Sequence, residues 1–153
     1  MGPRSARSEQ AAKIHTKSAI LRSSVIYGTS SENFLTWALT ELRDARVLNI
    51  VDDQIGSPTY APDIAEACLR VSQRGITGLF HAAGPESISR YEFTKRLAKA
   101  HGHDTEAVNA ISTAEAGQQA TRPDNSALDS TNLYDIIDYE FRDCKSGLEA
   151  CSP

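Results

Sequence analysis

The 153-residue sequence lacks the glycine-rich loop that most nucleotide-binding α/β proteins carry. None of its nine glycines fall into the G-x-G-x-x-G, G-x-x-G-x-x-G or Walker patterns, in which backbone N–H groups cradle phosphates. An α/β protein that bound a dinucleotide by itself would normally place such a loop after its first strand. We therefore expect no cofactor to be bound by this chain alone.

Cysteine is also scarce. Cys68, Cys144 and Cys151 make an odd count without C-x-x-C spacing, which indicates neither a disulfide framework nor a zinc site. His101 and His103 are one residue apart at a predicted helix end, so they could share a metal only in an extended conformation. We expect no metal site.

Long apolar runs and clusters of basic charge are missing too. No stretch approaches the roughly 20 residues that a transmembrane helix needs, and the first part of the chain is too polar for a secretory signal. The 16 Lys and Arg are scattered among 20 Asp and Glu, so no basic stripe marks a nucleic-acid surface. These absences predict a soluble, cytoplasmic protein without a membrane or nucleic-acid partner.

The composition that remains is that of an ordinary folded domain. Hydrophobic residues make up 40% of the chain and charged residues 24%, close to the average for soluble proteins, and this length suffices for one domain with its own core. We divide the chain into an N-terminal segment, 1–18, part of which resembles an expression tag, and an α/β module, 19–153. A short helix is predicted over about 6–15.

Strands and helices alternate along the module. Concentrated Ile, Leu and Val predict strands over 18–28, 46–51, 78–84 and 107–112. Helical spacing and end signals predict helices over 31–44 with Ser30 and Ser31 as caps, from Pro62 to about Gly75, and from the Ser89-x-x-Glu92 capping box to Gly102. A loop over 113–128 precedes two short helices. Strands separated by helices favour an α/β fold.

Polar groups concentrate in 51–67, "VDDQIGSPTYAPDIAEA", directly after a predicted strand. Asp, Ser, Gly and Pro are common turn formers and helix caps, so local structure accounts for about half of these residues. A loop that also offers an amide, hydroxyls and an aromatic ring can contact a sugar and a nucleobase. We expect at least one ligand contact in this stretch, among Asp52, Asp53, Gln54, Ser57, Thr59 and Tyr60.

Two further groups are candidates for a site. Ser23, Ser24 and Tyr27 lie toward the carboxyl end of the strand predicted over 18–28, where open α/β sheets bind ligands. Tyr91-x-x-x-Lys95 has the spacing in which the Lys of short-chain dehydrogenases lowers the pKa of a catalytic Tyr, and it puts both side chains on one helical face. Packing on the helix surface is the simpler interpretation of that pair, because such spacing recurs in helices of this composition.

Four motifs together resemble a known family. "ILRSSVIYG", "VDDQIGSPTYAPDIAEA", "GLFHAAGPESISRYEF" and "RPDNSALD" are similar, in order and in spacing, to the extended short-chain dehydrogenases, and most similar to the dTDP-dehydrorhamnose reductases. The resemblance runs from about Glu9 to Asp129 and implies the C-terminal, substrate-binding half of such an enzyme, with the NAD(P)-binding Rossmann half absent. It also implies a reaction in which NADP(H) delivers hydride to a keto-deoxysugar carried on a nucleoside diphosphate.

The resemblance implies roles for individual residues as well. Ser24 would lie near the nicotinamide of NADP(H). The substrate contacts that we predict for a sugar nucleotide are Asp53, Gln54, Thr59, Arg122 and Asn125, together with the aromatic candidate Tyr60.

Departures from the family pattern bear on catalysis. In the family a Glu closely follows Tyr-x-x-x-Lys, and setting that Glu on Glu9 puts Met1 at the Tyr position and Ser5 at the Lys position. Val25 stands where an aromatic residue often follows the Ser of the strand motif. Without a hydride-donor site, a proton donor or its activating Lys, we expect no catalytic residue and no carbonyl reduction by this chain alone.

Three functions stay open at this point. The chain is a sugar-nucleotide-binding domain that is catalytically incompetent alone, a non-catalytic regulatory or interaction subunit, or one chain of a two-chain reductase whose separate Rossmann-type chain supplies the Tyr, Lys and cofactor. All three predict a homo-oligomer or pairing with another chain, because a lone half-sheet leaves an unpaired strand edge.

Overall fold

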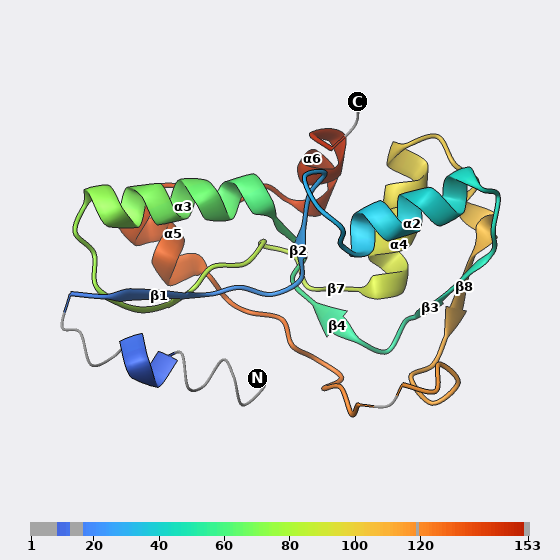
Figure 1. Cartoon of the computed structure of the whole chain (residues 1–153), viewed down its shortest axis with the longest axis horizontal. Helices are drawn as coiled ribbons and strands as arrows, with labels where there is room; N and C mark the ends of the chain where they lie inside the picture. Colours follow the sequence, from blue (N-terminus) through green and yellow to red (C-terminus); the bar gives the residue numbers. More distant parts are fainter. Residues whose placement is uncertain (1–8, 13–16, 119, 152–153) are drawn as a thin grey trace.

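The computed structural model describes residues 9–12, 17–118 and 120–151. After a helical turn at 9–12, the elements in chain order are β1 (Ala19–Arg22), β2 (Ile26–Tyr27), α2 (Phe34–Arg43), β3 (Leu48–Val51), β4 (Ile55–Gly56), β5 (Thr59–Tyr60), α3 (Ala61–Gln73), β6 (Gly78–His81), β7 (Ile88–Ser89), α4 (Arg90–Ala100), a 3₁₀ turn (Thr105–Ala107), β8 (Val108–Ile111), α5 (Thr131–Ile137) and α6 (Cys144–Glu149) (Figure 1). The predicted α/β class is confirmed. Met1, Ser5 and most of the predicted N-terminal helix lie outside the described residues.

The described strands form four two-stranded ladders. β1 pairs with β6, β2 with β5 and β3 with β8, all parallel, while β4 and β7 are antiparallel. Each parallel ladder joins strands that are far apart in the sequence, with at least one helix between them, as parallel connections require. Short strands at β4, β5 and β7 were not predicted, because two residues are too few to show a period.

The strand predicted over 18–28 is wrong as a single element, since the chain breaks into β1 and β2. Ser24 Oγ accepts a hydrogen bond from the backbone N–H of Ser57 (3.2 Å), and the Val25 carbonyl accepts one from Thr59 (2.8 Å). These contacts draw the chain away from β6 and toward the 57–59 segment. The hydroxyl-bearing residues of the motif therefore sit at a bend between two ladders.

The start of the first long helix also differs from its prediction. Ser30 and Ser31 do not cap it; Asn33 does, with its side-chain oxygen accepting from the backbone of Leu35 (2.9 Å). The Thr36 hydroxyl in turn accepts a hydrogen bond from the Asn33 N–H (2.9 Å). Such a reciprocal cap satisfies two backbone donors at once, which is why the helix begins three residues later than expected.

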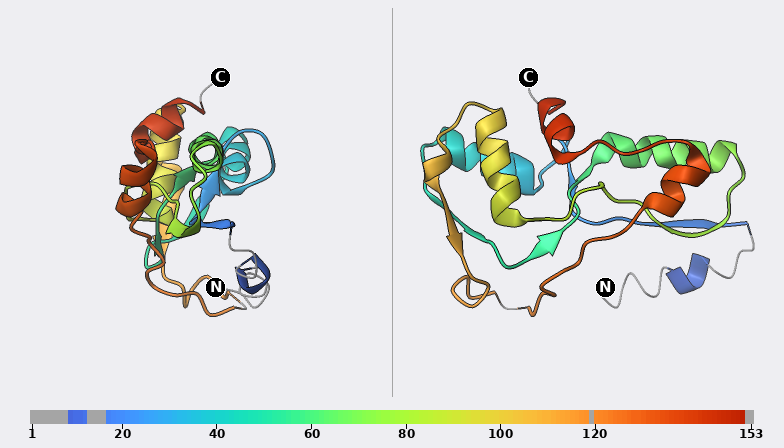
Figure 2. Two further views of the ribbon diagram at one scale, coloured as in Figure 1. Left: turned by 90° about the vertical axis from the view of Figure 1, so that its left-hand side faces the viewer. Right: turned by 180° about the vertical axis from the view of Figure 1, so that it is seen from behind.

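The core is divided between two ends of an elongated molecule. One cluster lies among α2, α4, β3, β8 and α6, and the other among α3, α5 and β6 (Figures 1 and 2). The short strands β2, β4, β5 and β7 lie between these ends. Polar segments that would not fill a core are thereby gathered in the middle of the fold.

A buried carboxylate fastens the C-terminal part of the chain to α3. Asp63 is fully buried and accepts hydrogen bonds from the Tyr139 hydroxyl (2.7 Å), from the backbone N–H of Arg142 (2.9 Å) and from the Arg142 guanidinium. A buried charge is stable only when it is paired and hydrogen-bonded in this way. The contact fixes the segment that leads from α5 to α6.

Within the described part of the chain, no helix is long and apolar enough to cross a membrane. Over the same residues, no three His, Cys, Asp or Glu side chains are placed to hold a metal ion together. The three cysteines are free thiols, and Cys144 and Cys151 are buried.

Candidate functional site

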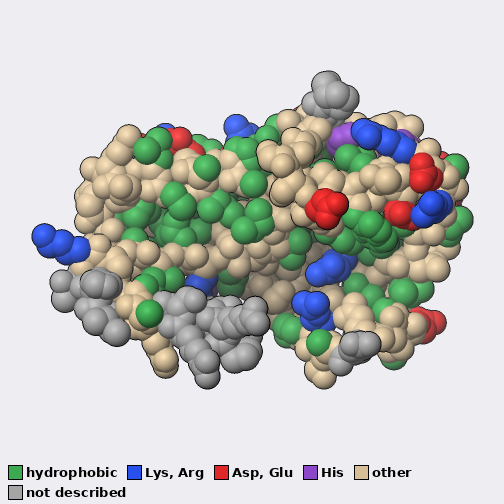
Figure 3. Space-filling view, viewed as in Figure 1, with side chains coloured by type: hydrophobic (Ala, Val, Ile, Leu, Met, Phe, Trp, Pro, Cys, Tyr) green, Lys and Arg blue, Asp and Glu red, His purple; other side chains and the backbone are tan. Residues whose placement is uncertain are grey.

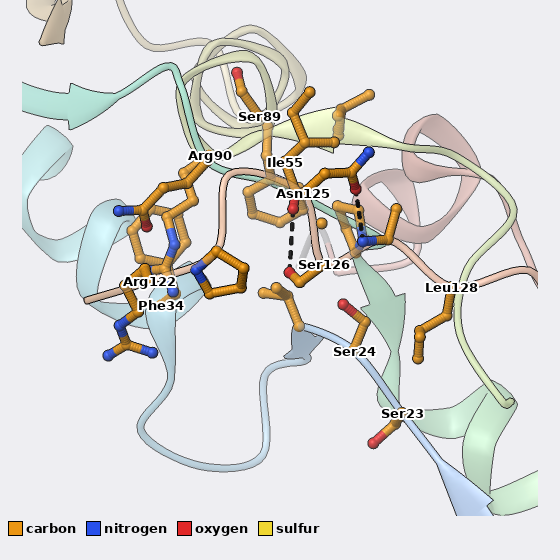
Figure 4. Close-up of a pocket in the computed structure, with 18 residues that line it drawn as sticks. Ser23, Ser24, Phe34, Ile55, Ser89, Arg90, Arg122, Asn125, Ser126 and Leu128 are labelled. Carbon is orange, nitrogen blue, oxygen red and sulfur yellow. Dashed lines mark hydrogen bonds between the residues drawn. The ribbon is translucent and has the colours of Figure 1, made fainter. Parts of the chain in front are cut away.

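A cavity of about 670 Å³ opens in the middle of the molecule, where β4 and β7 meet the starts of α2 and α4 (Figure 4). Its volume lies within the range of small-molecule sites. The lining comes from four separated parts of the chain and one helix residue: Ser23, Ser24 and Val25; Gln54, Ile55, Gly56 and Pro58; Ile88, Ser89, Arg90 and Phe93; Arg122, Pro123, Asn125, Ser126, Ala127 and Leu128; and Phe34.

The last of these segments is held against β4 by main-chain hydrogen bonds. The Ile55 N–H donates to the Asp124 carbonyl (2.8 Å), and the Ser126 N–H donates to the Ile55 carbonyl (2.9 Å). Farther along, the Leu128 N–H donates to Ser57 Oγ (3.2 Å). The "RPDNSALD" motif is thus one wall of the cavity, and 51–67 supplies the wall beside it.

One end of the cavity is cationic. Arg90, the first residue of α4, is half-buried and lies over the ring of Phe34, with its Cζ 5.3 Å from the ring centroid. Burial, together with the nearby charge of Arg122, lowers the pKa of the Arg90 guanidinium. No Asp or Glu is among the described residues that line the cavity. The two arginines lie at the same end as Phe34 in Figure 4.

The other end carries hydroxyl and amide groups. Ser23 and Ser24 lie across the cavity from the arginines, and Asn125 and Ser126 lie between these ends (Figure 4). The Asn125 side-chain oxygen accepts from the Ala127 N–H (2.9 Å), which leaves its NH₂ group for a ligand. An apolar wall with a few such polar groups is typical of a site that orients a small molecule.

Gln54 and Asp53 also fix the loop that follows β8. Gln54 lines the cavity, and its amide NH₂ donates to Thr113 Oγ1 (2.8 Å) and to Gln118 Oε1 (3.0 Å). Asp53 accepts from the Thr113 hydroxyl (2.6 Å) and N–H (2.8 Å), and these bonds lower its pKa. Asp53 does not line the cavity, whereas Gln54 does.

Thr59 and Tyr60 lie apart from the cavity. The Thr59 side chain is fully buried; its hydroxyl donates to the Ser57 carbonyl (2.9 Å) and accepts from the Gly84 N–H (3.1 Å). The Tyr60 ring packs 5.8 Å from that of Tyr27. The structure therefore brings four predicted site residues together at the cavity, Ser24, Gln54, Arg122 and Asn125, and places Asp53, Thr59 and Tyr60 elsewhere.

Phe34 and Arg90 are two cavity residues that the sequence did not single out. Phe34 occurs at helical spacing, which predicts a core residue. Arg90 follows a capping serine, a position at which any helix residue is acceptable. Their meeting depends on the packing of α2 against α4. Only the position of Arg90 inside a quoted family motif could have drawn attention to it.

The Tyr91 and Lys95 pair lies away from the cavity. Lys95 Nζ is 5.6 Å from the centroid of the Tyr91 ring, and Tyr91 packs against the first core cluster. Neither side chain lines the cavity, so its described lining holds no tyrosine or lysine to donate a proton.

Comparisons with known proteins place the chain in a family. The family described as the RmlD substrate binding domain matches residues 2–152. The dTDP-4-dehydrorhamnose reductase of Aggregatibacter actinomycetemcomitans is 32% identical over 144 residues, 87% of this chain and 49% of that protein. Methionine adenosyltransferase 2 subunit beta of Xenopus tropicalis is 31% identical over 128 residues, 77% of this chain and 38% of that protein.

A solved structure gives the same picture. The dTDP-4-dehydrorhamnose reductase from Bacillus anthracis, in complex with NADP, matches with a TM-score of 0.88 at 27% identity and covers 97% of this chain and 52% of that one. The chain thus spans about half the length of these reductases, as the sequence motifs predicted.

Proposed function

Because the chain belongs to the RmlD substrate binding domain family, we propose that its central cavity binds a nucleoside diphosphate sugar, a dTDP-linked deoxysugar. The observation that carries this proposal is the acid-free cavity whose two arginines, Arg90 and Arg122, share one end. Guanidinium groups bind phosphate oxygens through short, charge-assisted hydrogen bonds. The diphosphate would lie at this end and the sugar toward the hydroxyl and amide groups.

The predicted site residues divide into direct and indirect roles under this proposal. Arg122, Asn125 and Gln54 contact the ligand. Asp53 and Thr59 act through the loops that they hold, and Tyr60 supports the strand beside the site. The nearness of Ser24 to a nicotinamide stays a prediction.

The residues present do not fit a whole NADP(H) molecule. The sequence has no glycine-rich dinucleotide loop. The part of the cavity lining that the structure describes has two cations, which the substrate diphosphate would occupy. We therefore propose that these residues bind the sugar nucleotide without NADP(H), in the cytoplasm, and that reduction needs a Rossmann-type NADP(H)-binding domain.

Calorimetric titration of the purified chain with dTDP, a dTDP-sugar and NADPH tests the proposal. We expect the first two to bind and NADPH to give no signal. Arg122→Gln should weaken dTDP binding, whereas Arg43→Gln, an exposed arginine on α2 outside the cavity, should not. Absence of binding by dTDP and by the dTDP-sugar would overturn the proposal.

A pairing role is the second candidate, and the β1–β6 ladder favours it. None of its eight residues is buried, although parallel ladders are normally covered on both faces. Leu21 and Phe80 pack on the second core cluster, while Ile20 and Leu79, opposite each other in the register, belong to neither cluster. Figure 3 shows hydrophobic side chains gathered between α3 and β1.

We infer that this end of the molecule meets a second copy or a separate Rossmann-type chain. The similarity to a protein named as a subunit also supports pairing with another chain. Light scattering over a range of concentrations tests self-association. Leu69→Asn, on exposed α3, should weaken it, whereas Val47→Asn, exposed at the other end, should not. A strict monomer at high concentration would exclude a homo-oligomer.

A further inference from the structure

We propose that Arg90 is an anion-binding residue that lowers the stability of the empty protein, and that with Arg122 it selects a diphosphate over a monophosphate. The inference rests on the proposed function and adds to it the charge of the group that the cationic end of the cavity takes.

Arg90 differs from the other half-buried arginines of the described chain. Arg22, Arg70 and Arg96 each meet a carboxylate, at 2.7 Å from Glu9, 2.6 Å from Glu66 and 2.7 Å from Glu86. Within residues 9–12, 17–118 and 120–151, the Arg90 guanidinium stacks on the ring of Phe34 and has no hydrogen-bond or ion-pair partner. A cation stacked on an aromatic ring is held in place, but its N–H groups have no acceptor from the described protein residues.

The neighbour of Arg90 makes its position less favourable. Arg122 carries a charge of the same sign, and the effect of that charge on Arg90 is strong enough to lower the pKa of Arg90 further. Like charges near a partly desolvated site repel each other more than they would in water. An anion that lies between the two guanidinium groups would relieve this repulsion.

The backbone contributes positive potential at the same place. α4 is an 11-residue helix that begins at Arg90, so its N-terminus opens onto the cavity, and Ser89 Oγ caps it by accepting from the Glu92 N–H (3.1 Å). Helix N-termini carry a partial positive charge that favours anions. With two guanidinium groups added, this end of the cavity matches two linked phosphates better than one.

Each ligand fragment then has an expected rank. Inorganic pyrophosphate and dTDP should both bind, thymidine 5′-monophosphate should bind more weakly than dTDP, and thymidine should bind least. The affinity for dTDP should fall as salt is raised, because the interaction is between charges.

The variant Arg90→Gln tests the inference with two readouts. Its dTDP affinity should fall by about tenfold or more, the loss expected for one charge-assisted contact, and its preference for dTDP over the monophosphate should shrink. Its melting temperature without ligand should rise above that of the wild type. Arg70→Gln, which loses Glu66 and the carbonyls at the end of α5, should melt lower and bind dTDP normally.

The outcomes separate this inference from the proposed function. If Arg90→Gln melts lower than the wild type, or binds dTDP equally well, the role of Arg90 is wrong even where dTDP-sugars bind. If the wild type binds pyrophosphate but shows no preference for dTDP-sugars, the diphosphate site stands and the proposed substrate does not. If the wild type binds neither pyrophosphate nor dTDP, both are wrong.

Discussion

Gly84 lies where two backbones approach each other beside the cavity, and replacing it with alanine should destabilise the protein. A Cβ at this position would overlap the Pro58 carbonyl oxygen and lie 3.2 Å from its carbon. Both obstacles are backbone atoms, so no side-chain rotation relieves the clash. Pro58 and the residues after it would have to move.

The size of the effect follows from the contacts that this movement breaks. The Gly84 N–H donates to Thr59 Oγ1 (3.1 Å), and both groups are buried. Overpacking a dense region costs about 1–3 kcal/mol, and losing a buried hydrogen bond adds about 1 kcal/mol. We expect a total loss of about 3 kcal/mol, which lowers the melting temperature of a chain of this length by roughly 6–12 °C.

Thermal unfolding followed by circular dichroism measures this shift. Gly28→Ala is the matched control, because its Cβ would meet only the Ala61 Cβ at an ordinary 3.4 Å; it should melt near the wild type. Since Pro58 lines the cavity, Gly84→Ala should also bind dTDP more weakly at temperatures where it is folded. If Gly84→Ala melted as the wild type does, the close approach would be wrong.

Three other predictions follow from buried or hydrogen-bonded groups. Asp63→Asn should lower the free energy of unfolding in urea by about 3 kcal/mol, because the Arg142 contact loses its charge; an unchanged value would contradict the fastening role. Tyr27→Phe should raise the free energy of unfolding by about 1 kcal/mol, since the buried Tyr27 hydroxyl has no hydrogen-bond partner among the residues that the structure describes; a lower value would contradict this. The lowered pKa of Asp53 stabilises the fold above about pH 4, and this contribution is lost as pH falls through the folded pKa, so Asp53→Ala should flatten the acid limb of stability against pH.

The sequence predicts most of the helices because their signals are local. Pro62 falls in the first turn of α3, and Ser89 caps α4 through the Glu92 N–H as its spacing indicates. Short strands are different, because their partners decide them. The 18–28 segment is a uniform apolar run, yet β1 pairs with residues at 78–81 and β2 with residues at 59–60. No pattern within the run shows where it divides.

The candidate site is predictable to the same limited degree. Family motifs place Ser24, Arg122 and Asn125 in one cleft, and the structure brings them to one cavity. Residue type alone does not separate ligand contacts from structural ones. Asp53 accepts a hydrogen bond from the Thr113 N–H, and the Thr59 hydroxyl accepts one from the Gly84 N–H. Arg90 was not predicted as a site residue, because the sequence does not show which arginines pair with a carboxylate. That depends on how the elements pack.

The wall formed by 122–128 has a consequence for synthesis of the protein. The other walls, through Phe93, leave the ribosome first, but the cavity closes only when this late segment pairs with β4. Chains fold as they emerge, from the N-terminus onward. A nucleotide therefore cannot stabilise the nascent protein through this site until Leu128 has left the exit tunnel, and the earlier elements must stay folded, or shielded by chaperones, without help from the ligand.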